Sequence, residues 1–177
     1  GHEAMNMTAR ITNPSAISNI DTNAAAGWLT KLTATKADIA PVLARVALGA
    51  VIFPHGAQKV LGWFGGYGLT GTMGFMTGKL GIPAGFAALA IAAEFLGAIG
   101  LVTGTLSRVA AFGIAMTMLV ATFMVHAGNG FFMNWTGAQA GEGFEYHILA
   151  IALAAIVMVK GAGKWSVDQA LSSKLAK

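Results

Sequence analysis

The chain of 177 residues contains no cysteine and few charged side chains. The missing cysteines exclude disulfides, thiol redox chemistry and cysteine-ligated iron–sulfur clusters within this chain. Asp, Glu, Lys and Arg make up 10% of the residues, whereas a soluble domain normally contains about 25%. Hydrophobic residues make up 55%, and the mean hydropathy is +0.66. These values predict an integral membrane protein with room for one helical bundle.

The net charge of +4 does not indicate a nucleic-acid partner. The 11 Lys and Arg residues are scattered near the ends of apolar runs and form no continuous basic stripe. Positive charges in such positions are typical of helices oriented in a membrane. We therefore expect the lipid bilayer as a partner and no nucleic acid.

Four long apolar segments predict an all-α membrane protein built as a four-helix bundle. At 1.5 Å per residue, about 20 helical residues cross a hydrocarbon core of about 30 Å. The first three segments are long enough, whereas the fourth must include its polar start to cross. The segments lie at 39–61, 83–104, 108–126 and 144–159.

The distribution of positive charge predicts an orientation and a division of the chain. An even number of crossings places both termini on the side that carries most Lys and Arg, which the positive-inside rule makes cytoplasmic. We expect a polar or amphipathic N-terminal extension at 1–38, a membrane domain at 39–168 and a cytoplasmic tail at 169–177. The extension fits a short helix on the membrane surface and a disordered segment equally well.

The glycine-rich connection at 62–81 predicts a short interfacial helix between the first and second spans. Its apolar residues fall on one helical face, and aromatic residues near it and in 127–143 suit one membrane interface. Gly97, Gly100 and Gly104 in the second span are expected to let neighbouring helices approach closely.

Glu94 is the only charged residue in the apolar run 83–102. A carboxylate at that depth is costly, so it indicates a polar interior. The topology places the remaining polar groups near the outer end of the spans. We expect one outward-opening cavity lined by Glu94 with His55, Lys59, His126 and the pair Glu145 and His147.

The local spacing refines this cavity. His55 and Lys59 are four residues apart and share a helical face, and Pro54 predicts a kink just before His55. Glu145 and His147 are two apart, so only one is expected to face the cavity, and we favour Glu145. Structural explanations are also open: Lys59 can extend to the interface, His126 can cap a helix, and Glu94 can form an ion pair with Lys59.

The sequence RVALGAVIFPHGAQKVLGWFGG at 45–66 carries a family resemblance. Together with Gly71-Thr72, the Glu94 helix, the Gly104-x-x-x-Arg108 turn, the segment at 126–132 and Glu145-Tyr146, it resembles the DoxX family of bacterial four-helix membrane proteins. The likeness extends over 39–168.

The resemblance implies a quinone-linked oxidoreductase or redox subunit in the bacterial inner membrane. Relatives include the small membrane subunit of thiosulfate:quinone oxidoreductase, and other members belong to oxidative-stress complexes or to maturation of partner proteins. Quinone reduction takes up two protons with two electrons, which suits a buried carboxylate and histidines. We expect Glu94, His55 and Lys59 in catalysis, with substrate-binding residues His126, Glu145, Gln58 and Trp63.

The expected cofactor is a quinone, with no covalent cofactor and no metal. The electron donor would then be the substrate itself or a partner subunit. A second hypothesis is a non-catalytic accessory or structural subunit of a larger membrane complex, which docks through the N-terminal extension and glycine-lined helix faces. The expected protein partner is either another subunit or further copies of this chain in a homo-oligomer. Further alternatives are a metal site from His55, His126 and His147 with Glu94 or Glu145, and a small-molecule transporter.

Overall fold

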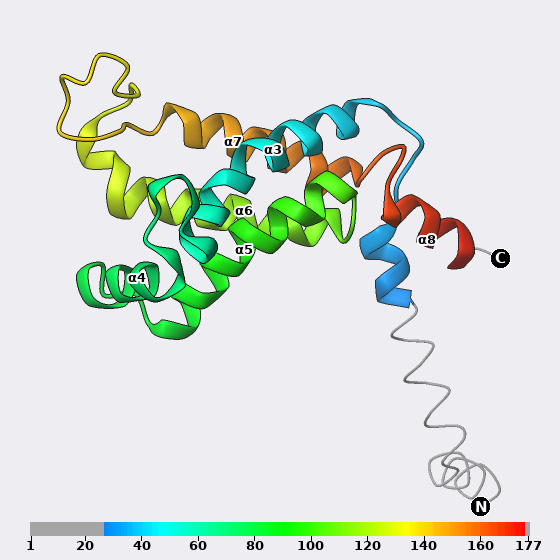
Figure 1. Ribbon diagram of the computed structural model, residues 1–177. Helices are drawn as coiled ribbons and strands as arrows, with labels where there is room; N and C mark the ends of the chain where they lie inside the picture. The colour runs from blue at the N-terminus through cyan, green and yellow to red at the C-terminus, as the bar shows by residue number, and fades with distance from the viewer. Residues whose placement is uncertain (1–26, 176–177) are drawn as a thin grey trace, which may run out of the picture.

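The computed structural model describes residues 27–175, and that range is helical and contains no strand (Figure 1). A short helix at 27–33 comes first, so this part of the predicted extension is helical, while 1–26 lie outside the described residues. The main helices are α3 (Ala40–Leu61), α5 (Ala84–Thr103), α6 (Ser107–Ala121) and α7 (Glu145–Lys160). The shorter ones are α4 (Gly68–Gly74) and α8 (Val167–Leu175).

Three helical stretches are long and apolar enough to cross a membrane: Ala40–Leu61, Ala84–Thr103 and Ser107–Asn129. The last joins α6 to a π-helical turn, η3 (Thr122–His126), and a 3₁₀ turn, η4 (Ala127–Asn129). The prediction of a multi-pass membrane protein is confirmed at this level. With 16 residues, α7 is about 24 Å long, shorter than a hydrocarbon core of about 30 Å.

The four main helices pack in sequence order. α5 contacts α3 and α6, and α7 contacts α6 and α3. The segment 27–33 and α8 lie at one end of the molecule, which we call the α8 end, whereas α4 and the loop before α7 lie at the other, which we call the loop end (Figure 1).

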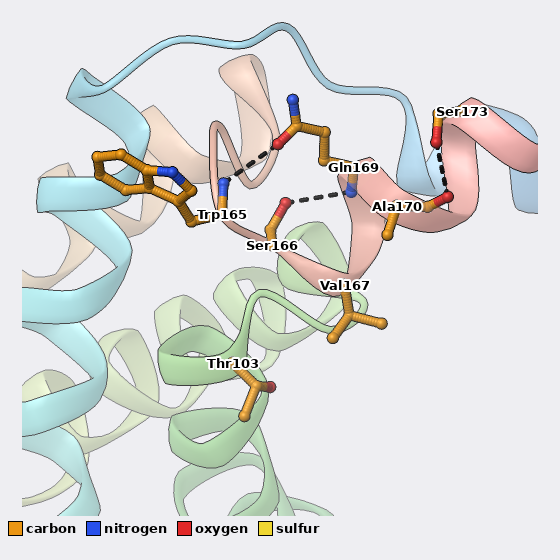
Figure 2. Close-up of a pocket in the computed structure, with 7 residues that line it drawn as sticks. All are labelled: Thr103, Trp165, Ser166, Val167, Gln169, Ala170 and Ser173. Carbon is orange, nitrogen blue, oxygen red and sulfur yellow. Dashed lines mark hydrogen bonds between the residues drawn. The ribbon is translucent and has the colours of Figure 1, made fainter.

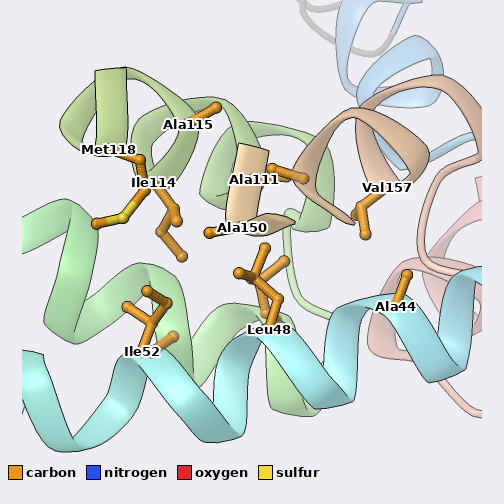
Figure 3. Packing of buried hydrophobic residues seen from close by; sticks show 12 residues of the cluster. Ala44, Leu48, Ile52, Ala111, Ile114, Ala115, Met118, Ala150 and Val157 are labelled. Carbon is orange, nitrogen blue, oxygen red and sulfur yellow. The ribbon is translucent and has the colours of Figure 1, made fainter. Parts of the chain in front are cut away.

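The core lies between α3, α5, α6 and α7, and many of its buried residues are alanines. Figure 3 shows Leu48 and Ile52 of α3 opposite Ile114 of α6 and Ala150 of α7. By contrast, the outward faces carry large exposed apolar side chains. Examples are Phe86, Leu89, Phe112, Phe123 and Leu149, each more than half exposed. Such an apolar exterior suits contact with lipid.

Glycines on α3 bring it against α5. A Cβ atom added at Gly56 would lie 2.6 Å from Cα of Phe95, and one at Gly49 would lie 2.9 Å from the carbonyl oxygen of Ala98. Of the three α5 positions that we expected to serve close packing, Gly97 has only contacts of 3.4 Å and more to Ile114 and Ala110. An added Cβ would lie 2.9 Å from the Thr105 carbonyl oxygen at Gly100 and 2.3 Å from the Ser166 Cβ at Gly104, so these two positions are crowded by the segments after α5 and before α8.

The connection between α3 and α5 is helical for much of its length, as the shared apolar face predicts. After a 3₁₀ turn, η1 (Trp63–Gly65), the chain forms α4 and then a π-helical turn, η2 (Phe75–Lys79). α3 itself continues unbroken through Pro54.

Arg45 joins three elements at the α8 end. It is 2% exposed and donates five hydrogen bonds, all to backbone carbonyl oxygens. Two acceptors, Leu101 and Val102, belong to α5, at 2.9 and 2.6 Å. The other three belong to the segment 162–165, which leads into α8. A single side chain thus connects α3, the end of α5 and the C-terminal segment.

Arg108 and Asp168 also connect elements at the α8 end through hydrogen bonds. Arg108 of α6 donates to the carbonyl oxygens of Met158 and Val159 in α7 and, at 2.9 Å, to that of Ala34. The carboxylate of Asp168 accepts the backbone N–H groups of Leu106 and Ser107 at 2.7 and 2.8 Å. It thereby caps the start of α6, where no side chain of α6 does so.

Candidate functional site

Glu94 is paired with Lys59 across the α3–α5 interface. The Lys59 ammonium donates a hydrogen bond to Oε2 of Glu94. The Glu94 side chain is 5% exposed, whereas that of Lys59 is 31% exposed. Glu94 is buried because it shares the inner face of α5 with Ile91, Gly97 and Ala98. The pair links a buried carboxylate to a cation that reaches the surface.

The backbone around Gly56 determines this pairing. Because Gly56 lacks a side chain, α3 can touch α5 at Glu94 and Phe95. Lys59 lies three residues further along α3, close to the same face. The rings of Phe53 and Phe95 stack at a centroid distance of 5.9 Å and close the interface on the other side of the glycine.

A row of aromatic and imidazole rings crosses the loop end from α3 to η3. The His55 ring centroid lies 6.2 Å from that of Tyr146, which lies 5.6 Å from that of His147. His147 and His126 are closer still, at 4.3 Å between centroids. Residues far apart in the sequence thus supply one row of ionisable groups, which begins one turn of α3 from Lys59.

Two polar atoms in this row lack a partner. The Tyr146 hydroxyl and Nδ1 of His147 are buried, and neither has a hydrogen-bond partner of good geometry in the described part of the chain, although the Phe144 backbone interacts with the His147 imidazole. His147 is only 5% exposed. Buried polar groups in proteins nearly always have partners, so an unpaired hydroxyl and ring nitrogen on consecutive residues suit an additional polar molecule.

His126 enters the row from a π-helical turn at the end of the third apolar stretch. Its Nδ1 atom lies 2.9 Å from the carbonyl oxygen of Glu142. Single π-helical turns occur often at functional sites, because they shift the side chains that follow them. The turn and the bond to Glu142 together hold the ring against His147.

The structure uses Glu145 differently from our expectation. Its Oε1 atom accepts hydrogen bonds from the backbone of Met133 at 2.9 Å and from the Trp135 indole at 3.2 Å. Glu145 therefore organises the loop before α7, and His147 faces the row instead. The reason lies in the helical period, since His147 continues the buried face formed by Ala150 and Ala154.

Gln58 and Trp63 shape the turn after α3. The Gln58 side-chain amide donates to the carbonyl oxygen of Phe64 at 3.3 Å. Trp63 is 53% exposed and packs edge-on against Phe64 at 6.3 Å between centroids. Both lie at the loop end, near Lys59 in sequence, and neither contacts Glu94 through a hydrogen bond in the described residues.

The histidines and carboxylates do not gather into a metal-binding arrangement within residues 27–175, where no group of three or more could hold an ion. Two surface depressions lie away from the row. One is lined by α8 residues with Thr103, and the other runs between α3 and α5.

The sequence gives no reason to place Tyr146 in a site, and its spacing favours Glu145 over His147 as the residue that faces the cavity. A signal for His147 was present, because it precedes Ala150 and Ala154 by three and seven residues and so shares their helical face. For the Tyr146 row no such signal exists, since it depends on how α7 is turned relative to α3.

The family model named DoxX matches residues 40–127, which run from α3 to the turn after η3. The chain belongs to the DoxX family. No curated protein and no solved structure matches it. In this DoxX-family chain, the matched range contains His55, Lys59, Glu94 and His126. It ends before α7, which contributes Tyr146 and His147 to the row.

Proposed function

We propose that this DoxX-like membrane protein is a quinone-linked redox protein, or the redox subunit of a larger complex, and that its site is the row at the loop end. The observation that carries the proposal is the pair of unpartnered buried atoms, the Tyr146 hydroxyl and His147 Nδ1. They lie between His55 and His126, in a row that starts one helical turn from the Lys59–Glu94 pair.

The residues present suit a quinone headgroup. Its carbonyl oxygens are hydrogen-bond acceptors, and the Tyr146 hydroxyl and an imidazole N–H are donors that lack other partners. A bound quinone would supply the capacity to accept two electrons and two protons. The protein would hold the headgroup with Tyr146 and His147.

Proton movement would fall to the ionisable groups on either side. His126 is half-buried and lies at the loop end, so it is suited to exchange protons with solvent. His55, on the exposed side of α3, would serve the same purpose at the other end of the row. Glu94 would act as the buried relay, with Lys59 as its electrostatic partner and its connection to the surface.

The membrane arrangement is part of the proposal. α7 would complete a fourth crossing with Glu145 and His147 at the interface, and α4 would lie in that interface. The segment 27–39, the last turn of α7 and the segment 161–175 lie at the α8 end and contain Lys31, Lys36, Lys160, Lys164 and Lys174, whereas the last turn of α3 and η2 lie at the loop end and contain Lys59 and Lys79. This asymmetry supports cytoplasmic termini in a bacterial inner membrane and a site on the outer side.

Replacement of Tyr146 by Phe tests the proposal with little structural disturbance. The removed hydroxyl has no partner in the protein, so folding should be unaffected. Binding of a soluble quinone analogue to the purified protein in nanodiscs should weaken about tenfold, the effect of about 1.4 kcal/mol from one lost hydrogen bond. The matched control is Tyr67→Phe, since Tyr67 is the only other tyrosine and is 82% exposed. Equal affinity in Y146F and wild type would overturn the proposal.

An accessory role is the second candidate, and the Lys59–Glu94 pair favours it, because an ion pair between α3 and α5 can serve assembly alone. The variant Glu94→Gln distinguishes the redox function from the accessory function. In a redox protein it should abolish quinone-dependent turnover and leave a folded protein, whereas in an accessory subunit it should reduce assembly. Deletion of 1–26, which spares the Ala34 carbonyl bound by Arg108, tests docking by loss of a co-purifying partner.

A further inference from the structure

His126 uses one of its two ring nitrogens to bind the loop before α7. Its Nδ1 atom lies 2.9 Å from the backbone carbonyl oxygen of Glu142. A carbonyl oxygen only accepts hydrogen bonds, so Nδ1 must carry a proton. A neutral imidazole carries a proton on one nitrogen only, so Nε2 of the neutral His126 ring keeps its electron pair and can accept a proton. The bond to Glu142 thus selects one of the two tautomers.

Further contacts hold the Glu142 carbonyl in place. The side-chain amide of Asn129 donates to the same oxygen at 3.1 Å. The Glu142 carboxylate accepts the backbone N–H of Asn134 at 2.6 Å. Gly141 packs against Asn129, since a Cβ atom added there would lie 2.7 Å from the Asn129 side-chain nitrogen. These contacts restrain the loop at Glu142, so that Nδ1 of His126 keeps its acceptor.

The remaining nitrogen, Nε2, lies on the side of the His126 ring away from the atom that binds Glu142. The ring itself packs against that of His147 at 4.3 Å between centroids, and Tyr146 adjoins His147 at 5.6 Å. The Tyr146 hydroxyl is buried and has no hydrogen-bond partner in residues 27–175. A ligand bound at Tyr146 and His147 would therefore lie beside a ring that can accept its proton.

The depression beside α8 offers no comparable group. Its polar lining residues are Thr103, Ser166, Gln169 and Ser173. Figure 2 shows the last three bonded to backbone groups of their own segment, and Thr103 donates to the carbonyl oxygen of Ile99 at 2.9 Å. Each side-chain oxygen there already has a partner within the protein. The row at the loop end is therefore the site to which a polar ligand is assigned.

We infer that His126 is the proton acceptor of the row, through Nε2, and that the ligand is bound as a hydroxylated aromatic ring, a hydroquinone or a phenol. The inference rests on the proposed quinone site, because a hydroquinone is the reduced form of a quinone. In the transfer, the O–H bond of the ligand breaks, an N–H bond forms at Nε2, and the electron pair of the O–H bond stays on the ligand oxygen. His126 becomes an imidazolium whose Nδ1–H still donates to Glu142, which stabilises the new charge.

Solid-state nitrogen NMR of the full-length protein in lipid bilayers tests the tautomer without a ligand. Protein containing nitrogen-labelled histidine is measured at mildly alkaline pH, where the rings are neutral. The His126 signals are identified by their loss in His126→Gln. They should show a protonated Nδ1 and an unprotonated Nε2, and the reverse assignment would overturn the inference.

Binding of duroquinone and durohydroquinone to the protein in nanodiscs, measured without oxygen, tests the ligand. The wild type should bind the hydroquinone more tightly, because only this form donates to Nε2. His126→Asn places an amide where Nδ1 was and leaves nothing in the position of Nε2. It should weaken hydroquinone binding about tenfold, the effect of one lost hydrogen bond, and leave quinone binding unchanged. His126→Gln is the matched variant, because its amide oxygen can take the place of Nε2, and it should retain more of the hydroquinone affinity than H126N.

The outcomes distinguish this inference from the proposed function. Equal binding of the two forms by the wild type, unchanged hydroquinone binding in H126N, or weaker hydroquinone binding in H126Q than in H126N would overturn the inference and leave the quinone site in place. Binding of neither form would overturn the proposed function and the ligand assignment together. The nitrogen NMR decides the tautomer in either case.

Discussion

Lys59 and Glu94 form an ion pair whose two members differ sixfold in exposure, 31% against 5% of their side-chain surfaces. The cation can reach water without its partner, and the carboxylate cannot. Loss of either side chain should therefore have different consequences.

Lys59→Met should destabilise the protein more than Glu94→Gln. The first leaves a buried carboxylate without its cation, at a cost of about 3 kcal/mol. The second leaves Lys59 free to turn toward solvent and should cost about 1 kcal/mol. Unfolding followed by circular dichroism in detergent measures both, and the double variant should recover most of the loss in K59M. Equal losses in the single variants would contradict this account of the pair.

Gly56→Ala should push α3 away from α5. The new methyl group would meet the Phe95 backbone at 2.6 Å, and backbone atoms cannot move aside cheaply. We expect a loss of about 1–3 kcal/mol in the free energy of unfolding. Gly85→Ala in the first turn of α5 is the control, because nothing lies within 4 Å of its added carbon. It should be neutral or stabilise by about 0.5 kcal/mol. Similar melting temperatures for both variants would show that the close approach of α3 and α5 at Gly56 does not determine the stability.

Arg45→Lys should loosen the C-terminal segment. A lysine has three donors on one nitrogen and cannot serve the five carbonyl groups that surround Arg45. Trypsin should then cleave after Lys164 faster than in the wild type. Arg108→Lys should have a smaller effect, since Arg108 makes three such bonds and its Nε has no partner. The prediction fails if R108K releases the segment as readily as R45K.

Asp168→Ala should destabilise α6 by about 1–2 kcal/mol, because two backbone amides at its start lose their acceptor. Ser107→Ala, at the same turn, should change the stability by less than about 0.5 kcal/mol, since its buried hydroxyl bonds to nothing in the described residues. Thermal melting of the two variants compares them directly. A larger loss in S107A would mean that the cap is the serine rather than the aspartate.

The sequence predicted the helices and the membrane character because apolar runs and their period are local properties. It also pointed to Glu94, since a lone carboxylate in such a run is conspicuous. The partner of Glu94 followed from topology together with the spacing of His55 and Lys59. In each case, the information lay within one or two segments.

What sequence reasoning missed depends on contacts between segments. Arg45 binds carbonyl groups, which every residue has, so no residue pattern could identify its partners. The row from His55 to His126 depends on the rotation of α7, which the packing of Ala150 and Ala154 determines. Glu145 bonds to the loop before α7, because the Met133 backbone and the Trp135 indole offer donors there that no residue pattern reveals.

The bonds of Arg45 also constrain the order of biosynthesis. Its most distant acceptor, Trp165, is made 120 residues later. At a synthesis rate of about 5–20 residues per second, the guanidinium waits at least about 6 seconds for that partner. Until then the Arg45 guanidinium must be solvated by water or lipid headgroups, so the contacts that join α3 to the C-terminal segment form only after residues 162–165 have been synthesised.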